Sequence, residues 1–338
     1  MTGSVLVGRA PSPGDISTGY DAVVVGSGAG GLTAAVCLAR QGRRVAVFEQ
    51  HFTAGGYTHA YRRPGWEWDV GIHAGGEVFV RTPVARIELD GARASGVVLA
   101  DGTQVRAPVV VSAAGAQNTF GTLLDDGDGE RSAVMRRGFP FVLLFLGLDG
   151  DPVEPGLPRH NLMVTDGDCD AFFDGTGVRT SGLFLSFSCA KDPTWTAQHP
   201  GRSTGEILAY VQPELFEPFQ GSRWRRRDPA YLALTAELTA ELLDQLHRHL
   251  PRTRGRVAYH ELGTPLTAEH FAGWPGGSLY GLAKDVAAFR DGRRPGTADW
   301  LRPRTGIDGL YLAGQDCLAG GFLGAVTGGL LAAHEALD

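Results

Sequence analysis

Short apolar runs alternate with glycine-rich turns along much of this chain, and the clearest such pattern covers residues 21–49. A four-residue apolar run, Ala22–Val25, is followed by a glycine-rich turn, an amphipathic stretch and a second apolar run. This order predicts a buried strand, a helix over residues 32–40 and a second strand that ends at Glu49. The pattern is that of a β-α-β unit.

The turn between the first strand and the helix has the composition of a dinucleotide-binding loop. Gly26 permits a tight turn, Gly28 lets a pyrophosphate approach the backbone, and Gly31 lets the helix pack closely on the strand. The phosphates would lie at the helix N-terminus, where free N–H groups and the helix dipole favour an anion. Glu49 lies 18 residues beyond Gly31, where it can accept hydrogen bonds from ribose hydroxyls and would repel a 2′-phosphate. The predicted site comprises Gly26, Ser27, Gly28, Ala29, Gly30, Gly31, Glu49 and Gln50.

A second pair of glycines, Gly55 and Gly56, follows the acid directly. Its position predicts a cofactor contact, with a plain glycine loop as the alternative. Residues 61–72 alternate in polarity around a Pro-Gly pair, which predicts a hairpin. A strand over residues 77–89, a hairpin about an Asp-Gly turn and a buried strand over residues 109–111 follow.

The middle of the chain predicts a different sheet. Apolar strands over residues 141–148, 183–187 and 206–211 are separated by loops rich in Asp, Gly and Pro. A long helix over residues 231–250 carries a leucine at every fourth position, which is typical of a core-facing stripe. The basic run RWRRR at residues 223–227 precedes it. We expect a solvated surface there, with contact to anionic lipid or a phosphate as the alternative.

Near the C-terminal end, LYLAGQD predicts a buried strand that delivers Asp316 to a turn, and a glycine run then opens a helix over residues 322–337. This arrangement offers a second helix N-terminus and an acid to the same cofactor. A plain NAD site does not need such a distant element, whereas the ribityl chain and ring of a flavin extend beyond one β-α-β unit. The sequence therefore favours FAD.

The amino-acid composition limits the possible domain count, partners and location of the protein. The 338 residues suggest two domains, and a net charge of −6 gives no support for nucleic-acid binding. The four cysteines form no CxxC pair, so neither a metal site nor a disulfide framework is expected, and a reducing cytoplasm is the expected location. Residues 1–19 are expected to form a flexible tail. No apolar run reaches membrane-spanning length, so we expect a soluble or membrane-peripheral protein.

These residues together resemble the all-trans-retinol 13,14-reductases (retinol saturases) and the carotenoid isomerases, within the phytoene desaturase-like FAD enzymes. The resemblance extends from Asp21 to Asp338, and the stretch at residues 188–195 and Gly314-Gln315-Asp316 are its most specific parts. The stretches that carry it are VVVGSGAGGLTAA, EQHFTAGGYTH, WDVGIH, VVSAAGAQNTF, SCAKDPTWTAQHPGRST, GTPLT, GSLYGL and LYLAGQDCLAGGFLGAVTGG.

The resemblance implies an α/β fold of the GR2 flavoprotein type. A Rossmann-like FAD-binding domain would comprise residues 20–116 plus 262–338, and residues 117–261 would form a reduced substrate-side domain on a mixed or antiparallel sheet. FAD would bind non-covalently, with the backbone of Val84 at the adenine and Gly55 and Gly56 near the flavin. Asp316 would meet the pyrophosphate or ribityl chain, beside Gly314 and Gly324.

One departure from the family pattern is large. The family has a long segment, including much of a helical cap, between GIH and a GGEV-like strand, whereas here His73 is followed at once by residues 74–78, AGGEV. Its loss should remove part of the wall over the flavin ring and affect water exclusion. Exposure of the surface that the cap normally covers predicts self-association, a partner chain or membrane adhesion.

Three functions compete. The first is an FAD oxidoreductase that saturates or desaturates carbon–carbon double bonds of a lipophilic polyene, with NAD(P)H as a candidate transient electron donor. The second is a flavin-dependent cis–trans isomerase without net redox change, and the third is a flavin-binding remnant or partner-dependent subunit. We assign no catalytic side chain; His73 and His160 are the histidines of interest, although a lone histidine is more often structural.

Overall fold

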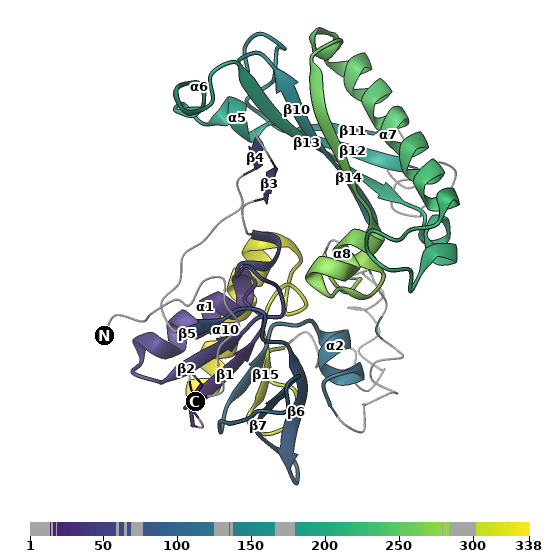
Figure 1. Cartoon of the computed structure of the whole chain (residues 1–338). Helices are drawn as coiled ribbons and strands as arrows, with labels where there is room; N and C mark the ends of the chain where they lie inside the picture. Colours follow the sequence, from purple (N-terminus) through teal and green to yellow (C-terminus); the bar gives the residue numbers. More distant parts are fainter. Residues whose placement is uncertain are drawn as a thin grey trace.

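The structure is a computed structural model of the chain, and it describes residues 14, 16–17, 19–58, 61–63, 66–68, 77–124, 135, 138–165, 180–278, 280–283 and 302–338. Figure 1 shows two bodies, one around a parallel sheet and one around an antiparallel sheet backed by a long helix. The join after His73, between residues 69 and 76, lies outside the described residues.

The parallel sheet is the core of the first body. Its strand order is β15-β9-β1-β2-β5, and every neighbouring pair is parallel. The strands are β1 (Ala22–Val25), β2 (Val45–Phe48), β5 (Glu77–Phe79), β9 (Val110–Ser112) and β15 (Leu310–Leu312). Their near-continuous burial is typical of a parallel sheet that is covered on both faces. The predicted Rossmann-like β-α-β unit is confirmed.

Two helices cover one face of this sheet, and a small antiparallel sheet covers the other. α1 (Ala29–Arg40) and α10 (Gly321–Leu337) share an apolar cluster with Val24 and Val47. On the opposite face, Val23 and Phe48 pack with residues of the small sheet and of α2 (Ala116–Gly121). The small sheet comprises β6 (Val84–Asp90), β7 (Arg93–Leu99) and β8 (Gln104–Arg106).

Several predicted elements have different bounds in the structure, and two of these differences bear on the candidate site. α1 begins at Ala29 rather than at residue 32, with Gly28 as its N-cap. The single strand predicted over residues 77–89 is two strands in two sheets, β5 and β6. The chain turns at Arg81, where φ is 55°, and Pro83 has no N–H to continue a ladder. The N–H groups of Arg81 and Thr82 donate instead to the carbonyls of His51 and Glu49.

The second body is an antiparallel sheet in the order β11-β12-β13-β10-β14. Its strands are β10 (Phe141–Asp149), β11 (Leu162–Val164), β12 (Thr180–Ser186), β13 (Arg202–Val211) and β14 (Val257–Gly263). α7 (Pro229–His249) begins at the cap Asp228, whose Oδ1 accepts a hydrogen bond from Ala230 N at 2.7 Å. Leu238, Leu242 and Leu246 are fully buried against the sheet, so the predicted leucine stripe is confirmed.

Shorter elements connect these layers. They are η1 (Gly56–Thr58), β3 (Tyr61–Arg63), β4 (Trp66–Trp68), α5 (Ser188–Lys191), α6 (Trp195–Gln198), η2 (Pro213–Leu215), η3 (Glu217–Phe219), η4 (Pro251–Thr253), α8 (Pro265–Ala272) and η5 (Pro275–Gly277). Within the described part of the chain, no helix combines the length and apolarity needed to cross a membrane.

The β3-β4 hairpin lies against the second body, although its neighbours in sequence belong to the first (Figure 1). A Cβ placed on Gly147 would lie 2.7 Å from the Trp66 ring, so only a glycine admits the indole there. The Arg202 guanidinium lies 5.2 Å from the centre of the same ring. The hairpin predicted over residues 61–72 is therefore confirmed over its described part, and the predicted domain bounds stay a prediction.

Leu242→Ala should lower the free energy of unfolding by about 2–5 kcal/mol, because it leaves a cavity between α7 and the sheet. Leu232→Ala on the same helix is the matched control. That side chain is 57% exposed, and its loss should change the free energy by no more than about 0.5 kcal/mol. Urea unfolding measures both. Equal losses in the two variants would contradict the assignment of the buried face.

Candidate functional site

The N-terminus of α1 packs closely against two turns, the glycine turn after β1 and the turn after β15. Gly26 has φ 90°, which a glycine adopts without strain. A Cβ on Gly31 would lie 2.1 Å from the Gly26 carbonyl oxygen, and one on Gly30 would lie 2.5 Å from the backbone of Gly314. Only glycine fits at Gly30 and Gly31, because a side chain there would clash with the backbone of the neighbouring turn. These close contacts bring the turn after β15 to the start of α1.

Gly28 and Gly314 differ from these packed glycines. A Cβ on either would meet nothing within 4 Å. Gly28 is the N-cap of α1, and α10 begins seven residues after Gly314 (321 − 314). The N-terminus of α1 and the turn after β15 therefore both border space that side chains do not fill, which suits the backbone approach of a pyrophosphate.

Glu49 fastens the glycine turn to the following loop. Its Oε2 accepts hydrogen bonds from Ser27 N at 2.8 Å and Ser27 Oγ at 2.6 Å, and its Oε1 accepts one from His51 N at 2.8 Å. Ser27 Oγ in turn accepts from Gly55 N at 3.1 Å. The side chain was predicted to face the ribose, and that contact stays a prediction, since a carboxylate offers more lone pairs than these three bonds use. Its positioning role was missed, because nothing in the local sequence shows where Ser27 Oγ points.

The second glycine pair joins the predicted site directly. Gly55 and Gly56 have φ of 120° and 55°, and Gly55 forms a parallel bridge with Gly28. A Cβ on Gly56 would lie 3.0 Å from Gly28 Cα. The Gln50 amide lies against Gly273, where a Cβ would lie 2.6 Å from Nε2. The structure therefore brings the glycine pair to the cradle, and the predicted cofactor contact of Gln50 stays a prediction.

Asp316 is 1% exposed and connects three distant segments. Its Oδ2 accepts a hydrogen bond from Ala116 N at 2.8 Å, and its Oδ1 accepts one from Leu282 N at 2.9 Å. The expected contact with a pyrophosphate or ribityl chain stays a prediction. What the structure adds is a structural role, since this carboxylate ties the turn after β15 to the start of α2 and to the loop after η5.

The remaining predicted contacts lie near these turns or beside the core. Gly324 is in the first turn of α10, where a Cβ would lie 1.9 Å from the Ala319 carbonyl oxygen. Val84 begins β6, is half-buried and packs against the first body's core. Ala29 is buried at the start of α1. Their roles toward a cofactor stay predictions.

The fold is that of a dinucleotide-binding protein. Residues 24–77 match the family described as "NAD(P)-binding Rossmann-like domain". An oxidoreductase from Methanosarcina mazei has the same fold over 93% of this chain and 99% of its own, with a TM-score of 0.60 and 14% identity.

Sequence relatives are more specific. The all-trans-retinol 13,14-reductase of Danio rerio is 32% identical over 276 residues, which is 76% of this chain and 45% of the relative. The chain is a relative of the retinol saturases. The chloroplastic prolycopene isomerase of Arabidopsis thaliana is 26% identical over 277 residues, which is 78% of this chain and 42% of the isomerase. The resemblance to the retinol saturase and carotenoid isomerase branch is thus confirmed. The chain spans about half the length of these curated relatives.

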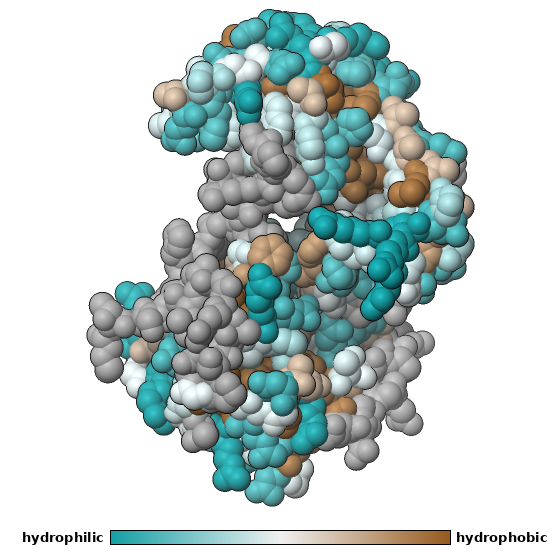
Figure 2. Space-filling model, in the orientation of Figure 1, coloured by the Kyte–Doolittle hydropathy of each residue, from teal (hydrophilic) through white to brown (hydrophobic). Residues whose placement is uncertain are grey.

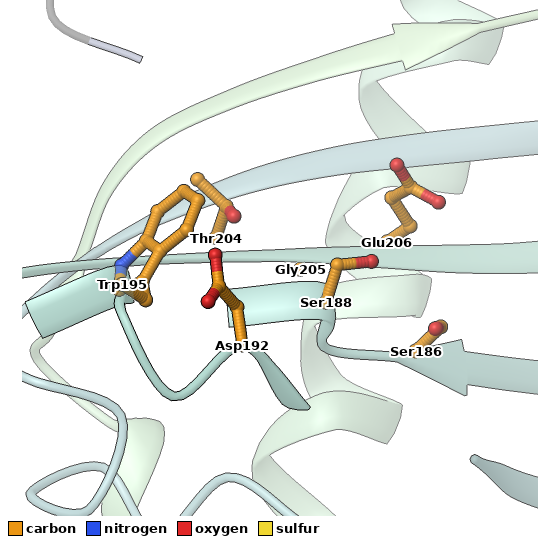
Figure 3. Close-up of a pocket in the computed structure, with 7 residues that line it drawn as sticks. All are labelled: Ser186, Ser188, Asp192, Trp195, Thr204, Gly205 and Glu206. Atoms are coloured by element: carbon orange, nitrogen blue, oxygen red, sulfur yellow. The ribbon is translucent and has the colours of Figure 1, made fainter. Parts of the chain in front are cut away.

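The stretch at residues 188–195, which resembles the family most specifically, forms a small polar pocket beside β13 (Figure 3). The cavity measures about 20 Å³, which is room for one water molecule. Buried Cys189 donates from Sγ to the Thr204 carbonyl at 3.0 Å, and burial raises the pKa of its thiol. The pocket is lined by Ser186, Ser188, Asp192, Trp195, Thr204, Gly205 and Glu206.

Glu206 is the acid that the sequence reading missed. It lies on the sheet face opposite α7, in a row with Phe145 and Ser186 across the strands. Burial raises the pKa of its carboxyl, and the charge of Lys191 opposes that shift. Lys191 is held by the Ser186 hydroxyl at 3.0 Å and by Asn161 Oδ1. The available signal was an acid at the start of the apolar strand predicted over residues 206–211.

The two histidines of interest, His73 and His160, do not form a site in the described structure. His160 is exposed just before β11, and His73 lies outside the described residues. No group of three His, Cys, Asp or Glu side chains gathers to hold a metal ion among the residues that the structure describes.

Asp316→Asn should lower the free energy of unfolding by about 1–3 kcal/mol, because an amide nitrogen cannot accept from a backbone N–H. Asp244→Asn, at an exposed pair with Arg248, is the control and should cost at most about 1 kcal/mol. Urea unfolding of the cofactor-free protein compares them. Identical stability of Asp316→Asn and wild type would contradict the structural role.

Glu206→Gln should change how stability depends on pH. The raised pKa means that the folded state holds the Glu206 proton more tightly than the unfolded state. The stability from this group is therefore complete at low pH and is lost as pH rises through the folded pKa. Because glutamine cannot ionise, the variant should gain stability relative to wild type as pH rises above the ordinary pKa of a glutamate, about 4.3.

Urea unfolding across this pH range is the measurement, and exposed Glu214→Gln is the matched control for removal of one carboxylate. A difference between Glu206→Gln and wild type that stays constant with pH would show that Glu206 ionises freely in the folded state.

Proposed function

We propose that this chain binds FAD non-covalently and acts as an oxidoreductase on carbon–carbon double bonds of a lipophilic, polyene-like substrate. The observation that carries the proposal is the open space at Gly28, the N-cap of α1, and at Gly314, whose backbone lies against Gly30. The relation to all-trans-retinol 13,14-reductases and prolycopene isomerases supports the reaction class and the polyene substrate.

FAD suits this cradle better than a nicotinamide cofactor. The first β-α-β unit of a Rossmann domain holds the pyrophosphate. In this chain the turn after β15, from the far end of the sequence, lies against the same glycine turn. An acid at the end of β2 also disfavours the 2′-phosphate of NADPH at this position. NAD(P)H would then act as a transient electron donor rather than as the resident cofactor.

Different residues of this chain would bind the cofactor, shape its site and contact the substrate. Backbone N–H groups at the start of α1 and α10 would bind the pyrophosphate, and Glu49 and Ser27 would hold the glycine turn in shape. The bound flavin supplies hydride exchange. The half-buried side chains of Leu143, Phe145 and Leu208 face away from α7 on the second sheet, and this apolar surface would contact the polyene.

Enclosure of the substrate would require more than the described residues. We infer that a second copy of the chain, a partner protein or a membrane surface covers the apolar face of the second sheet. Figure 2 shows apolar residues at the visible surface of the upper body, among hydrophilic ones. A location at the cytoplasmic surface of a membrane would suit a lipophilic substrate.

Gly28→Val tests the cofactor site. Because a Cβ there meets nothing within 4 Å and φ is −63°, the variant should fold. It should nevertheless lose the flavin absorption near ~450 nm, since valine would occupy the pyrophosphate position. The measurement is the absorption spectrum of purified protein after addition of FAD and desalting.

Arg40→Val places the same residue at the exposed far end of α1 and should retain the flavin. Full flavin occupancy in Gly28→Val would refute the placement of the site. Colourless wild-type protein after FAD addition would refute the proposed cofactor.

The isomerase is the second candidate, because prolycopene isomerases are also among the relatives. Incubation of the pre-reduced holoprotein with an all-trans or a cis polyene, followed by mass spectrometry, separates the two. A product heavier by two hydrogens supports saturation, and an isomer of unchanged mass supports isomerisation. Bound flavin with no product would support the non-catalytic or partner-dependent alternative.

A further inference from the structure

A second pocket, of about 610 Å³, lies between α8 and the loop that precedes α7. Six of the residues around it matter here. They are Ser222, Arg223, Trp224, Arg226 and Arg227 from the loop and His270 from α8. Figure 2 shows strongly hydrophilic residues at the waist of the molecule, where Figure 1 places α8 and the turns that lead to α7. The basic run predicted to be a solvated surface thus forms one wall of a concave site.

The pocket is positively charged in a protein of net charge −6. Three guanidinium groups line it, and Glu269 is the one acid among the lining residues. Within the described part of the chain, no carboxylate forms an ion pair with Arg223, Arg226 or Arg227. Clustered unpaired guanidinium groups attract an anion, and their planar donors match the oxygens of a phosphate.

Arg227 is anchored rather than loose. Its Nη1 donates to the Ser222 carbonyl and to Ser222 Oγ, and its Nη2 donates to the Leu266 carbonyl at 3.5 Å. The guanidinium also lies 5.3 Å from the centre of the Tyr231 ring. Its Nε is buried and has no hydrogen-bond partner among the described residues. A buried N–H without an acceptor is unfavourable, and Arg227 is one of the residues that line the pocket.

The opposite wall is rigid and aromatic. The Trp224 ring stacks on His270 at 5.6 Å with an interplanar angle of 10°, and its edge meets Phe271 at 4.9 Å. Between these arginines, Arg225 has φ 61°, a conformation that a non-glycine residue adopts only when its surroundings hold it there. The loop is therefore fixed in a shape that keeps Arg223 and Arg226 at the pocket.

We propose that this pocket binds the dianion of a phosphate monoester, with Arg223 and Arg226 as its exposed ligands and Arg227 as the anchored one. The phosphate could belong to a free small molecule or to the head group of a lipid. The pocket is also one helix away from the dinucleotide cradle. α8 carries His270 at the pocket and ends at Gly273, which lies against Gln50 and whose carbonyl accepts from Asn118 Nδ2 at 2.7 Å.

The test compares the full chain with Arg223→Ala/Arg226→Ala. Titration calorimetry with glycerol 3-phosphate reports the free ligand. Co-sedimentation with vesicles of phosphatidylcholine mixed with phosphatidic acid, against phosphatidylcholine alone, reports the head group. Wild type should bind one of these probes, and the double variant should bind it at least about tenfold more weakly because two charged donors are lost. Inorganic phosphate should compete with the probe that binds.

Arg40→Ala/Arg43→Ala removes the same charge from exposed positions on the first body and should bind like wild type. Thermal unfolding and the flavin spectrum are measured for both double variants. Unchanged values would show that any loss belongs to the pocket and is independent of the proposed cofactor site. Absence of wild-type binding to both probes, or equal losses in the two double variants, would overturn the proposal.

Discussion

The start of α1 lies so close to the turns after β1 and β15 that no side chain fits between them. Gly31 meets the Gly26 carbonyl, and Gly30 meets the backbone of Gly314. These contacts join the two ends of the parallel-sheet body, which are far apart in sequence. Because they hold the N-terminus of α1 beside the turn after β15, the positions of the candidate glycine contacts depend on them.

Two buried acids then secure that arrangement. Glu49 links the glycine turn to the loop of Gly55, and Asp316 links the turn after β15 to α2 and to the segment at Leu282. Both carboxylates accept backbone N–H groups that would otherwise be buried without a partner, and hydrogen bonds to an ionised group are among the stronger ones in proteins. The cradle is thus shaped before any ligand arrives, which reduces the ordering cost of binding.

The sequence predicted those parts of the fold that depend on local pattern. The β1-α1-β2 unit and the leucine stripe of α7 follow from periodicity and glycine spacing, and both are confirmed. The break at Arg81 was missed, although Pro83 within the run was a signal against one continuous strand. The separation of β5 and β6 depends on hydrogen bonds to His51 and Glu49, which lie about thirty residues earlier.

The same distinction applies to the candidate site. Glycine spacing located Gly28 and Gly31, whereas the inward bonds of Glu49 and Asp316 depend on partners 22 and 200 residues away. The β3-β4 hairpin shows the limit most plainly, since Trp66 packs on Gly147 of the other body although its alternation predicts only a hairpin. Long-range packing decides which surface a local element covers, and local pattern does not record it.

This division of the molecule has a functional consequence. All the glycines of the cradle lie on the parallel-sheet body, whereas Phe145, Leu208 and Glu206 lie on the face of the antiparallel sheet that points away from α7. Under the proposed function, the cofactor contacts come from the first body and the contact with the polyene comes from the second sheet. The proposal therefore makes flavin binding and turnover two separate properties, which must be measured separately.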